Sequence, residues 1–163
     1  MFTVGIITSS DKGYSGERED KSGKVIEEIV SENGFNVIIK VVLPDEKTLL
    51  ENEMINMCDN LNVNLLLTTG GTGFSKRDIT PEATRDIIER EAPGICEAIR
   101  MYSMQITKRA MLSRAVSGIR KDTLIVNLPG SPKACKEALD YVLDDIKHGI
   151  DILLGTSKEC ARK

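Results

Sequence analysis

Acidic residues and glycines stand where the sequence pattern changes from an apolar run to a helical one. Asp45 follows one apolar run, and the glycine-rich segment 70–73 follows another, with Asp78 close behind. The glycines allow backbone N–H groups to curl around an anion, and the hydroxyl of Thr72 adds a donor. Because a carboxylate repels a bound anion unless a cation lies between them, Asp78 indicates magnesium, and Asp45 offers a second oxygen ligand or a phosphate-positioning group. The pattern predicts a site for phosphate and Mg²⁺.

Each of these features also has an ordinary structural explanation. Asp45 fits an N-cap for a following helix, and Asp11 and Asp20 fit turn and cap positions. A glycine cluster between strand and helix is frequently a plain turn, and this one matches neither the Walker P-loop nor the dinucleotide fingerprint. The segment 127–131 fits a tight turn followed by a cap. The functional interpretation depends on these segments converging on one edge of one sheet.

The elements that must position these residues follow from hydrophobic periodicity. Apolar runs at 2–8, 36–43, 64–69 and 123–128 predict buried strands, and helical spacing separates the first three. This alternation predicts parallel strands with right-handed crossovers, so that ligands collect beyond the carboxyl ends of the strands. The loops expected at that edge are Ser9–Asp11, Leu43–Glu46, Gly70–Gly73 continuing through Asp78 and Thr80, and Asn127–Ser131.

The second half of the chain predicts further helices and an edge hairpin. Thr80 is expected to cap a helix that runs from about Pro81 to Glu91. The run 114–120, two turn residues and the run 123–128 fit a hairpin that adds an antiparallel edge strand. Ser131 and Pro132 are expected to start the last helix.

Composition limits the chain to one domain, residues 1–163, with a net charge of -3. This balance gives no long-range attraction for nucleic acid or anionic lipid, and no apolar segment approaches membrane-spanning length. We expect a soluble, cytoplasmic protein without nucleic-acid or membrane partners.

Cysteines and histidine exclude several reaction types. The spacing of the cysteines lacks the close pairs typical of zinc or redox sites, which predicts reduced, structural thiols. With His148 as the only histidine, zinc sites built from several imidazoles and Ser/His/Asp or Cys/His sets are not expected. The cysteines are Cys58, Cys96, Cys135 and Cys160.

Magnesium carboxylates and phosphate-binding loops without a histidine base fit phosphoryl or nucleotidyl transfer by a nucleophile that is already ionised. A phosphate that attacks ATP is such a nucleophile, because its oxygen needs no proton removed at neutral pH. The obstacle is repulsion between two anions, which a metal ion and backbone dipoles offset.

The segment Thr68–Thr84, with the sequence TTGGTGFSKRDITPEAT, closely resembles the signature of the MogA/MoaB family of molybdenum cofactor biosynthesis proteins. Further matches occur in the expected order and extend the resemblance over essentially the whole chain. They are Leu43–Glu46, Met111–Arg114, Gly118–Arg120 and Asn127–Gly130.

This resemblance implies a three-layer α/β/α sandwich with a mainly parallel sheet, commonly assembled as a trimer. It also implies transfer of AMP from ATP to the phosphate of molybdopterin, giving adenylyl-molybdopterin and pyrophosphate. Asp45 and Asp78 match the family's two essential aspartates, which we assign as catalytic residues and Mg²⁺ ligands. The residues expected to bind the substrates are Ser9, Asp11, Asp20, Gly70, Gly71, Thr72, Gly73, Thr80, Ser103, Ser113, Asn127, Pro129 and Gly130.

Two other functions fit the same resemblance. The chain would then hold molybdopterin without adenylylating it, or act as a scaffold that presents identical surfaces of a trimer to other cofactor-assembly proteins. The presence of both Asp45 and Asp78 favours the enzyme. Hand-over of molybdopterin or its product to other assembly proteins is also expected.

Overall fold

The computed structural model describes residues 1–156, and within them six strands form one sheet in the order β2-β1-β3-β6-β5-β4. The strands β1, β2, β3 and β6 pair in parallel, whereas β4 and β5 are antiparallel to their neighbours. The predicted parallel sheet and antiparallel edge strand are both confirmed. The bounds are β1 Thr3–Ser9, β2 Asn36–Leu43, β3 Leu65–Thr69, β4 Arg90–Glu91, β5 Ser117–Arg120 and β6 Thr123–Leu128.

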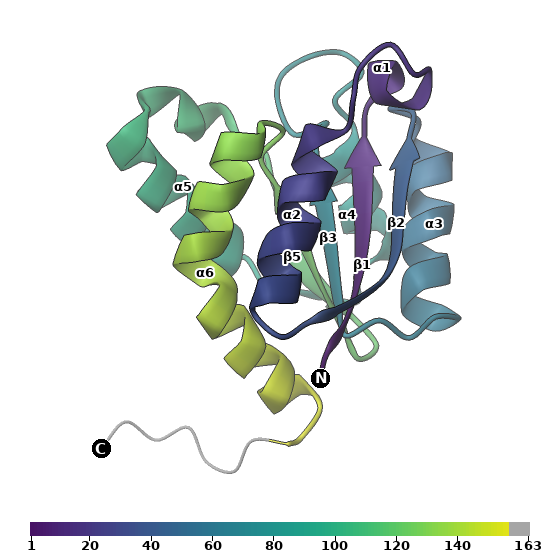
Figure 1. The fold of residues 1–163 in the computed structure, drawn as a ribbon, viewed down its shortest axis with the longest axis vertical. Helices are drawn as coiled ribbons and strands as arrows, with labels where there is room; N and C mark the ends of the chain where they lie inside the picture. Colours follow the sequence, from purple (N-terminus) through teal and green to yellow (C-terminus); the bar gives the residue numbers. More distant parts are fainter. Residues whose placement is uncertain (157–163) are drawn as a thin grey trace.

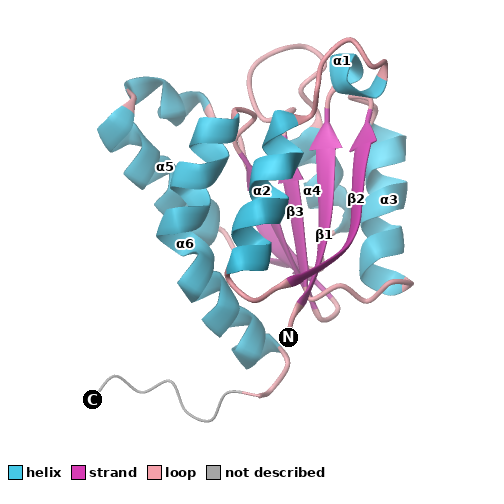
Figure 2. Ribbon diagram, in the orientation of Figure 1, coloured by secondary structure: helices cyan, strands magenta, loops and turns pink. Residues whose placement is uncertain are grey.

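Helices cover both faces of this sheet, which gives the expected three layers (Figures 1 and 2). Side chains that neighbour each other along a strand pack in opposite directions. Ile6 joins the core under α2 and α6, while Ile7 joins the core under α3 and α4. The helices are α1 Asp11–Tyr14, α2 Lys21–Glu32, α3 Lys47–Asp59, α4 Thr80–Ile87, α5 Gly94–Ile106 and α6 Pro132–Leu153, with a 3₁₀ helix, η1, at Lys108–Leu112.

The starts of α2 and α6 are fixed by side-chain caps. Asp20 accepts a hydrogen bond from the backbone N–H of Gly23 at 2.9 Å, and Ser131 accepts one from Ala134 at 3.1 Å. Both residues are those that the sequence predicts, because the cap and its partner lie within one turn of each other.

The helix expected from Pro81 to Glu91 is shorter, and Thr80 is not its cap. The helix ends at Ile87, and Arg90–Glu91 instead form β4 beside β5. The hydroxyl of Thr80 donates to the carbonyl of Gly70 at 3.0 Å, and the N-cap position belongs to Ile79. Both corrections have one cause, since distant segments compete successfully with the local helical pattern.

The predicted edge strand begins at Ser117 rather than at Arg114. The backbone N–H of Arg114 donates to the carbonyl of Thr72 at 2.9 Å, and that of Val116 donates to the side chain of Asn127 at 3.0 Å. These bonds take the start of the segment out of the β5–β6 ladder and into the loops beyond the sheet.

Cys58, Cys96 and Cys135 are buried and carry free thiols. Burial raises the pKa of the Cys58 and Cys135 thiols to about 11, as expected for structural cysteines. Cys160 lies outside the described residues. Within residues 1–156 there is no helix with the length and apolar character needed to cross a membrane.

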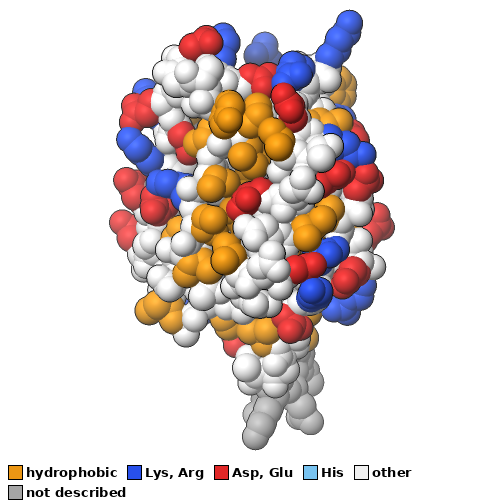
Figure 3. All heavy atoms as spheres, turned by 90° about the vertical axis from the view of Figure 1, so that its right-hand side faces the viewer, with side chains coloured by type: hydrophobic (Ala, Val, Ile, Leu, Met, Phe, Trp, Pro, Cys, Tyr) orange, Lys and Arg blue, Asp and Glu red, His pale blue; other side chains and the backbone are white. Residues whose placement is uncertain are grey.

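One edge of the molecule carries exposed apolar side chains. Figure 3 shows hydrophobic atoms gathered over β2, the outermost parallel strand, and over the adjacent α3. Ile38 and Leu49 are 43% and 41% exposed there. The strand β2 is therefore an edge strand that exposes an apolar side chain, Ile38, between the exposed polar residues Asn36 and Lys40.

Candidate active site

The parallel strands end at a common edge of the sheet, below α1 and the long loop after β3 (Figure 1). Gly71 adopts a φ of +67°, and a Cβ atom there would lie 2.4 Å from Oγ1 of Thr80 and 3.3 Å from Oδ1 of Asp45. A Cβ atom on Gly70 would lie 2.3 Å from the carbonyl oxygen of Ser9. The glycines thus let the loop pack directly against the ends of neighbouring strands.

Asp45 is held by the loop after β1 rather than acting as a helix cap. Its Oδ1 accepts from Ser9 Oγ at 2.6 Å, and its Oδ2 accepts from the backbone N–H of Asp11 at 3.0 Å. In return, the backbone N–H of Asp45 donates to Oδ1 of Asp11 at 3.0 Å. The N-cap of α3 is Glu46, whose side chain makes no capping bond. The structure removes the cap explanation for Asp45.

An ion pair links the Asp11 loop to the glycine loop. The Arg77 guanidinium donates to Asp11 through Nη2 at 2.8 Å and also through Nε. These bonds from Arg77, followed by the one from the backbone of Asp45, lower the pKa of the Asp11 carboxyl. Asp11 is therefore ionised at neutral pH, and its carboxylate is occupied by protein donors.

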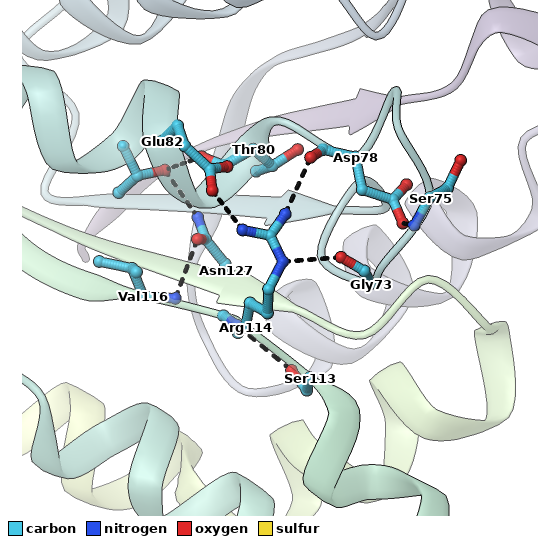
Figure 4. A network of polar contacts seen from close by, with 11 residues as sticks. Gly73, Ser75, Asp78, Thr80, Glu82, Ser113, Arg114, Val116 and Asn127 are labelled. Atoms are coloured by element: carbon cyan, nitrogen blue, oxygen red, sulfur yellow. Dashed lines mark hydrogen bonds and ion pairs between the residues drawn. The ribbon is translucent and has the colours of Figure 1, made fainter.

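Asp78 folds back onto the same glycine loop. Its Oδ2 accepts from the backbone N–H of Ser75 at 2.9 Å, and a Cβ atom on Gly73 would lie 2.8 Å from that oxygen (Figure 4). Asp45 contacts the loop at Gly71 and Asp78 contacts it at Gly73. Both carboxylates therefore lie against the same glycine loop, at the edge of the sheet where the sequence analysis expects these segments to converge.

A polar cleft of about 890 Å³ opens beside this loop, between the N-terminal ends of α2 and α6. Asp20 lies on its wall, where it caps α2 and accepts from Thr8 Oγ1 at 3.0 Å. Backbone N–H groups and helix N-termini favour phosphate in such a cleft. The predicted residues that line it are Ser9, Asp20, Gly70, Gly71 and Gly130.

A second, smaller cavity of about 270 Å³ lies between α5, η1 and α6. Gly130 lines both cavities, so they meet at the loop after β6. The predicted residues that line the smaller cavity are Thr72, Ser103, Ser113, Asn127, Pro129 and Gly130. Ser103, Ser113 and Asn127, which come from three separate segments of the chain, thus line one cavity together.

Arg100 and Arg109 line this smaller cavity and were not predicted. Arg100 donates through Nη1 to the carbonyl of Ala115 at 2.8 Å, which holds its guanidinium at the wall. A usable signal is the spacing of Arg100 and Ser103, which places both on the same face of α5. The two arginines outnumber the one carboxylate of the lining, Glu137, so the lining is net positive, which suits an anionic substrate.

Asn127 lines the cavity but uses its amide group inside the protein. Its side chain is completely buried, with Oδ1 accepting from Val116 N at 3.0 Å and Nδ2 donating to the hydroxyls of Thr68 and Thr84, each at 2.9 Å. These bonds join β6, α4 and the segment before β5. We therefore interpret Asn127 as a residue that builds the cavity wall.

The donor set bears on which metal the site fits. Among residues 1–156, His, Cys, Asp and Glu side chains form no group of three or more that is arranged to hold a metal ion. Asp45 and Asp78 offer hard oxygen atoms, and Mg²⁺ is usually held by one or two carboxylates together with water and substrate phosphates. In type, though not yet in geometry, these oxygen donors suit a Mg²⁺ ion that is bound together with a nucleotide.

Known proteins resemble this chain over nearly its full length. Residues 5–148 match the family described as "Probable molybdopterin binding domain". The chain is 41% identical over 162 residues to the molybdopterin adenylyltransferase of Helicobacter pylori J99, covering 98% of this chain and 92% of that protein. It is 39% identical over 154 residues to the molybdopterin adenylyltransferase of Escherichia coli K12, covering 90% and 78%.

The fold has equally close counterparts among solved structures. The molybdopterin biosynthesis enzyme MoaB from Thermus thermophilus superposes with a TM-score of 0.90 at 43% identity, covering 95% of this chain and 98% of that one. A structure of MogA superposes with a TM-score of 0.88 at 30% identity, covering 93% and 99%. Sequence, fold and the arrangement of the loops agree, and the chain belongs to the MogA/MoaB family of molybdenum cofactor biosynthesis proteins.

Proposed function

We propose that this protein is a molybdopterin adenylyltransferase, which transfers AMP from ATP to the phosphate of molybdopterin in molybdenum cofactor biosynthesis. The observation that carries the proposal is the meeting of Asp45 and Asp78 at one glycine loop beside a polar cleft. Relatives that bear this enzyme's name, at 39–41% identity, support it.

The two cavities suggest how the substrates are arranged. ATP would occupy the larger cleft, with its phosphates against Gly70–Thr72, and molybdopterin would occupy the smaller cavity beside Arg100 and Arg109. Because Gly130 lines both spaces, the molybdopterin phosphate and the α-phosphate would meet there. A Cβ atom on Gly130 would lie 3.6 Å from Cα of Gly70, at van der Waals contact, so the loop after β6 lies directly against the glycine loop at this point.

The reaction then needs positioning more than acid–base chemistry. An ionised oxygen of the molybdopterin phosphate forms a bond to the α-phosphorus of ATP, while the bond from that phosphorus to the bridging oxygen of the β-phosphate breaks and pyrophosphate leaves. Asp45 and Asp78 would hold Mg²⁺, which when bound neutralises phosphate charge. Loop N–H groups and the Thr72 hydroxyl would orient the phosphates for in-line attack.

Formation of adenylyl-molybdopterin from molybdopterin, ATP and magnesium is the direct test. Asp78→Ala and Asp45→Ala should each lower the rate by roughly 100-fold or more, as expected when preorganised charge is lost at a transition state. Asp122→Ala is a matched control, because Asp122 is exposed in the turn between β5 and β6, at the opposite edge of the sheet. Full activity in Asp78→Ala would contradict the catalytic assignment.

The alternative, a protein that holds molybdopterin without adenylylating it, is favoured by the smaller cavity having its own positive wall, which Arg100 and Arg109 of α5 and η1 provide. Calorimetry separates the two functions. Tight binding of molybdopterin together with no magnesium-dependent consumption of ATP would select the binding protein.

We also propose a cytoplasmic homotrimer that exchanges molybdopterin and product with other cofactor-assembly proteins. Exposed apolar side chains on α5 and η1, among them Met101 and Met111 at 66% and 58% exposure, support self-association. Light scattering should give about three times the chain mass of 18.0 kDa. A monomer at micromolar concentration would contradict the trimer.

A further inference from the structure

The loop that carries Asp78 has little to hold it by itself. Residues 74–77 are exposed, and Phe74 is 70% exposed, so no hydrophobic side chain anchors this segment. Its internal bonds connect Ser75 and Asp78 to each other, through the backbone at 3.0 Å and through the Asp78 carboxylate at 2.9 Å. These bonds shape the tip of the loop but do not attach the tip to the sheet.

Besides the exposed pair of Arg77 with Asp11, Arg114 attaches this loop from outside. Its Nε donates to the carbonyl of Gly73 at 2.7 Å, and its Nη2 donates to the carbonyl of Asp78 at 2.8 Å. Its backbone N–H also donates to the carbonyl of Thr72 at 2.9 Å. As Figure 4 shows, the guanidinium bridges the beginning and the end of the loop, on either side of the Asp78 carboxylate.

The guanidinium itself is fixed from two sides. Its Nη1 pairs with Oε1 of Glu82 in the first turn of α4 (Figure 4). The chain behind it is fixed because Val116 donates to the buried Asn127. Burial would raise the pKa of Glu82, but the bond from Arg114 and further donors outweigh burial and lower it, so the partner stays charged at neutral pH.

We propose that Arg114 is a positioning residue for adenylyl transfer, whose guanidinium holds the loop 72–78 in the shape that turns the Asp78 carboxylate toward the glycine loop. This inference rests on the proposed function for its effect on catalysis. Its effect on the loop follows from the contacts alone. The planar fork of arginine matters, because a lysine ammonium carries one nitrogen and does not span the carbonyls of Gly73 and Asp78 together with Glu82.

Arg120→Gln provides a matched control for Arg114→Gln. Arg120 also uses its whole guanidinium, donating to Asp59 at 3.0 and 2.7 Å and to the carbonyl of Ile87 at 2.9 Å, but it lies at the opposite edge of the sheet. Both variants lose a half-buried arginine fork. They differ in whether the fork touches the Asp78 loop.

Hydrogen exchange of the full-length protein without ligands tests the loop directly. Arg114→Gln should speed exchange of the amides of Ser75 and Asp78 by roughly tenfold or more, because the loop opens locally, whereas Arg120→Gln should leave them unchanged. In Arg114→Lys, the exchange rates of these two amides should be close to those in Arg114→Gln. Unchanged exchange at Ser75 and Asp78 in both Arg114 variants would overturn the inference.

Kinetics tests the consequence for catalysis. Arg114→Gln should lower kcat by roughly 10–100-fold and raise the magnesium concentration needed for half-maximal rate, as is typical when a partner of a metal ligand is lost. Arg120→Gln should change neither. Full rescue of kcat and magnesium dependence by Arg114→Lys would overturn the role of the fork. If Arg114→Gln does not fold, Arg114→Lys against wild type serves as the deciding pair.

The two proposals fail in different ways. Absence of adenylyl-molybdopterin with the wild-type protein would reject the proposed function, and faster exchange in the Arg114 variants would still support the hold on the loop. Normal wild-type activity with an Arg114→Gln variant equal to Arg120→Gln in kcat would reject the positioning role.

Discussion

Arg114 precedes the short strand β5 and Arg120 is its last residue, and the two make the same kind of contact at opposite ends of the sheet. Arg120 binds Asp59 and the carbonyl of Ile87, which are the last residues of α3 and α4. Arg114 binds carbonyls of an exposed loop and a carboxylate in the first turn of α4. One arginine joins the ends of two helices, and the other holds a loop.

This difference indicates that the end of the sheet where the parallel strands begin and the end where they finish have different roles. At the edge where the parallel strands begin, the guanidinium satisfies groups at helix C-termini, where positive charge is favourable. At the edge where they end, Gly70 and Gly71 of the glycine loop, together with the starts of α2 and α6, line a cleft. We expect changes at the first edge to cost stability and changes at the second to cost activity.

The largest effect is expected from Gly71→Ala, with Gly34→Ala as its match at the other edge. Both glycines have positive φ angles, +67° and +82°, so alanine should strain each backbone by about 1–2 kcal/mol. Only Gly71 has a neighbour in the way, since its Cβ atom would meet Oγ1 of Thr80 at 2.4 Å, whereas Gly34 has nothing within 4 Å. Adenylyl transfer should fall roughly 100-fold or more in Gly71→Ala through misplaced phosphate donors.

Thermal unfolding and activity measured on both glycine variants decide this comparison. Gly34→Ala should unfold at a lower temperature and keep the wild-type kcat. Equal loss of activity in the two variants would mean that the edges are not functionally different.

A second pair of variants compares a buried residue with a less buried one at the end of the sheet where the parallel strands finish. Asn127→Ala leaves the N–H of Val116 and the hydroxyl of Thr68 without a buried partner and should lower the free energy of unfolding by about 2–4 kcal/mol. Ser113→Ala should change stability by less than about 0.5 kcal/mol and raise the KM for molybdopterin. Denaturant unfolding and steady-state kinetics measure both. A stable Asn127→Ala variant that has lost only molybdopterin binding would make Asn127 a direct ligand instead.

Asp59→Asn tests only the end of the sheet where the parallel strands begin, where we expect changes to affect stability and not activity. Arg120 lowers the pKa of the Asp59 carboxyl through a hydrogen bond, and both side chains are about one-fifth exposed. Replacing the carboxylate by an amide should cost about 1–2 kcal/mol of unfolding free energy, because the paired charge is lost but solvent partly screens it. Urea unfolding should show this loss with kcat unchanged. A drop in kcat without loss of stability would contradict the assignment.

The fold was largely predictable because its signals are local. The apolar runs that became β2 and β6 have the predicted bounds, and the caps Asp20 and Ser131 lie next to the groups that they bind. The two-residue β4 was missed because it forms only by pairing with β5, which comes later in the chain. The helical pattern around it indicates α4 and carries no information about that partner.

The candidate site was predictable to the level of loops and not of contacts. Residue type and position indicated Asp45 and Asp78, but the mutual bonds of Asp11 and Asp45 join residues 34 positions apart. Arg114 spans 36 positions to reach the carbonyl of Asp78. An arginine in a sequence is usually interpreted as a solvated charge. Only the packing of distant loops brings Arg114 into hydrogen-bond distance of the Asp78 loop.

The smallest effect is expected from the exposed ion pair of Arg77 and Asp11. The pKa of Asp11 is lowered below its ordinary value of 3.8, so the pair's contribution to stability is present above pH 3.8 and disappears as pH falls through the lowered pKa. Arg77→Gln should return the Asp11 pKa toward 3.8, as NMR titration of the carboxyl would show, and should leave stability between pH 6 and 8 nearly unchanged, as is typical of exposed pairs. Lys76→Gln is the control, because within residues 1–156 its neighbour Arg77 pairs with Asp11 and Lys76 does not. If the Asp11 pKa in Arg77→Gln were the same as in the wild-type protein, the bond from Asp45 alone would set it. Arg77 would then not connect the two loops.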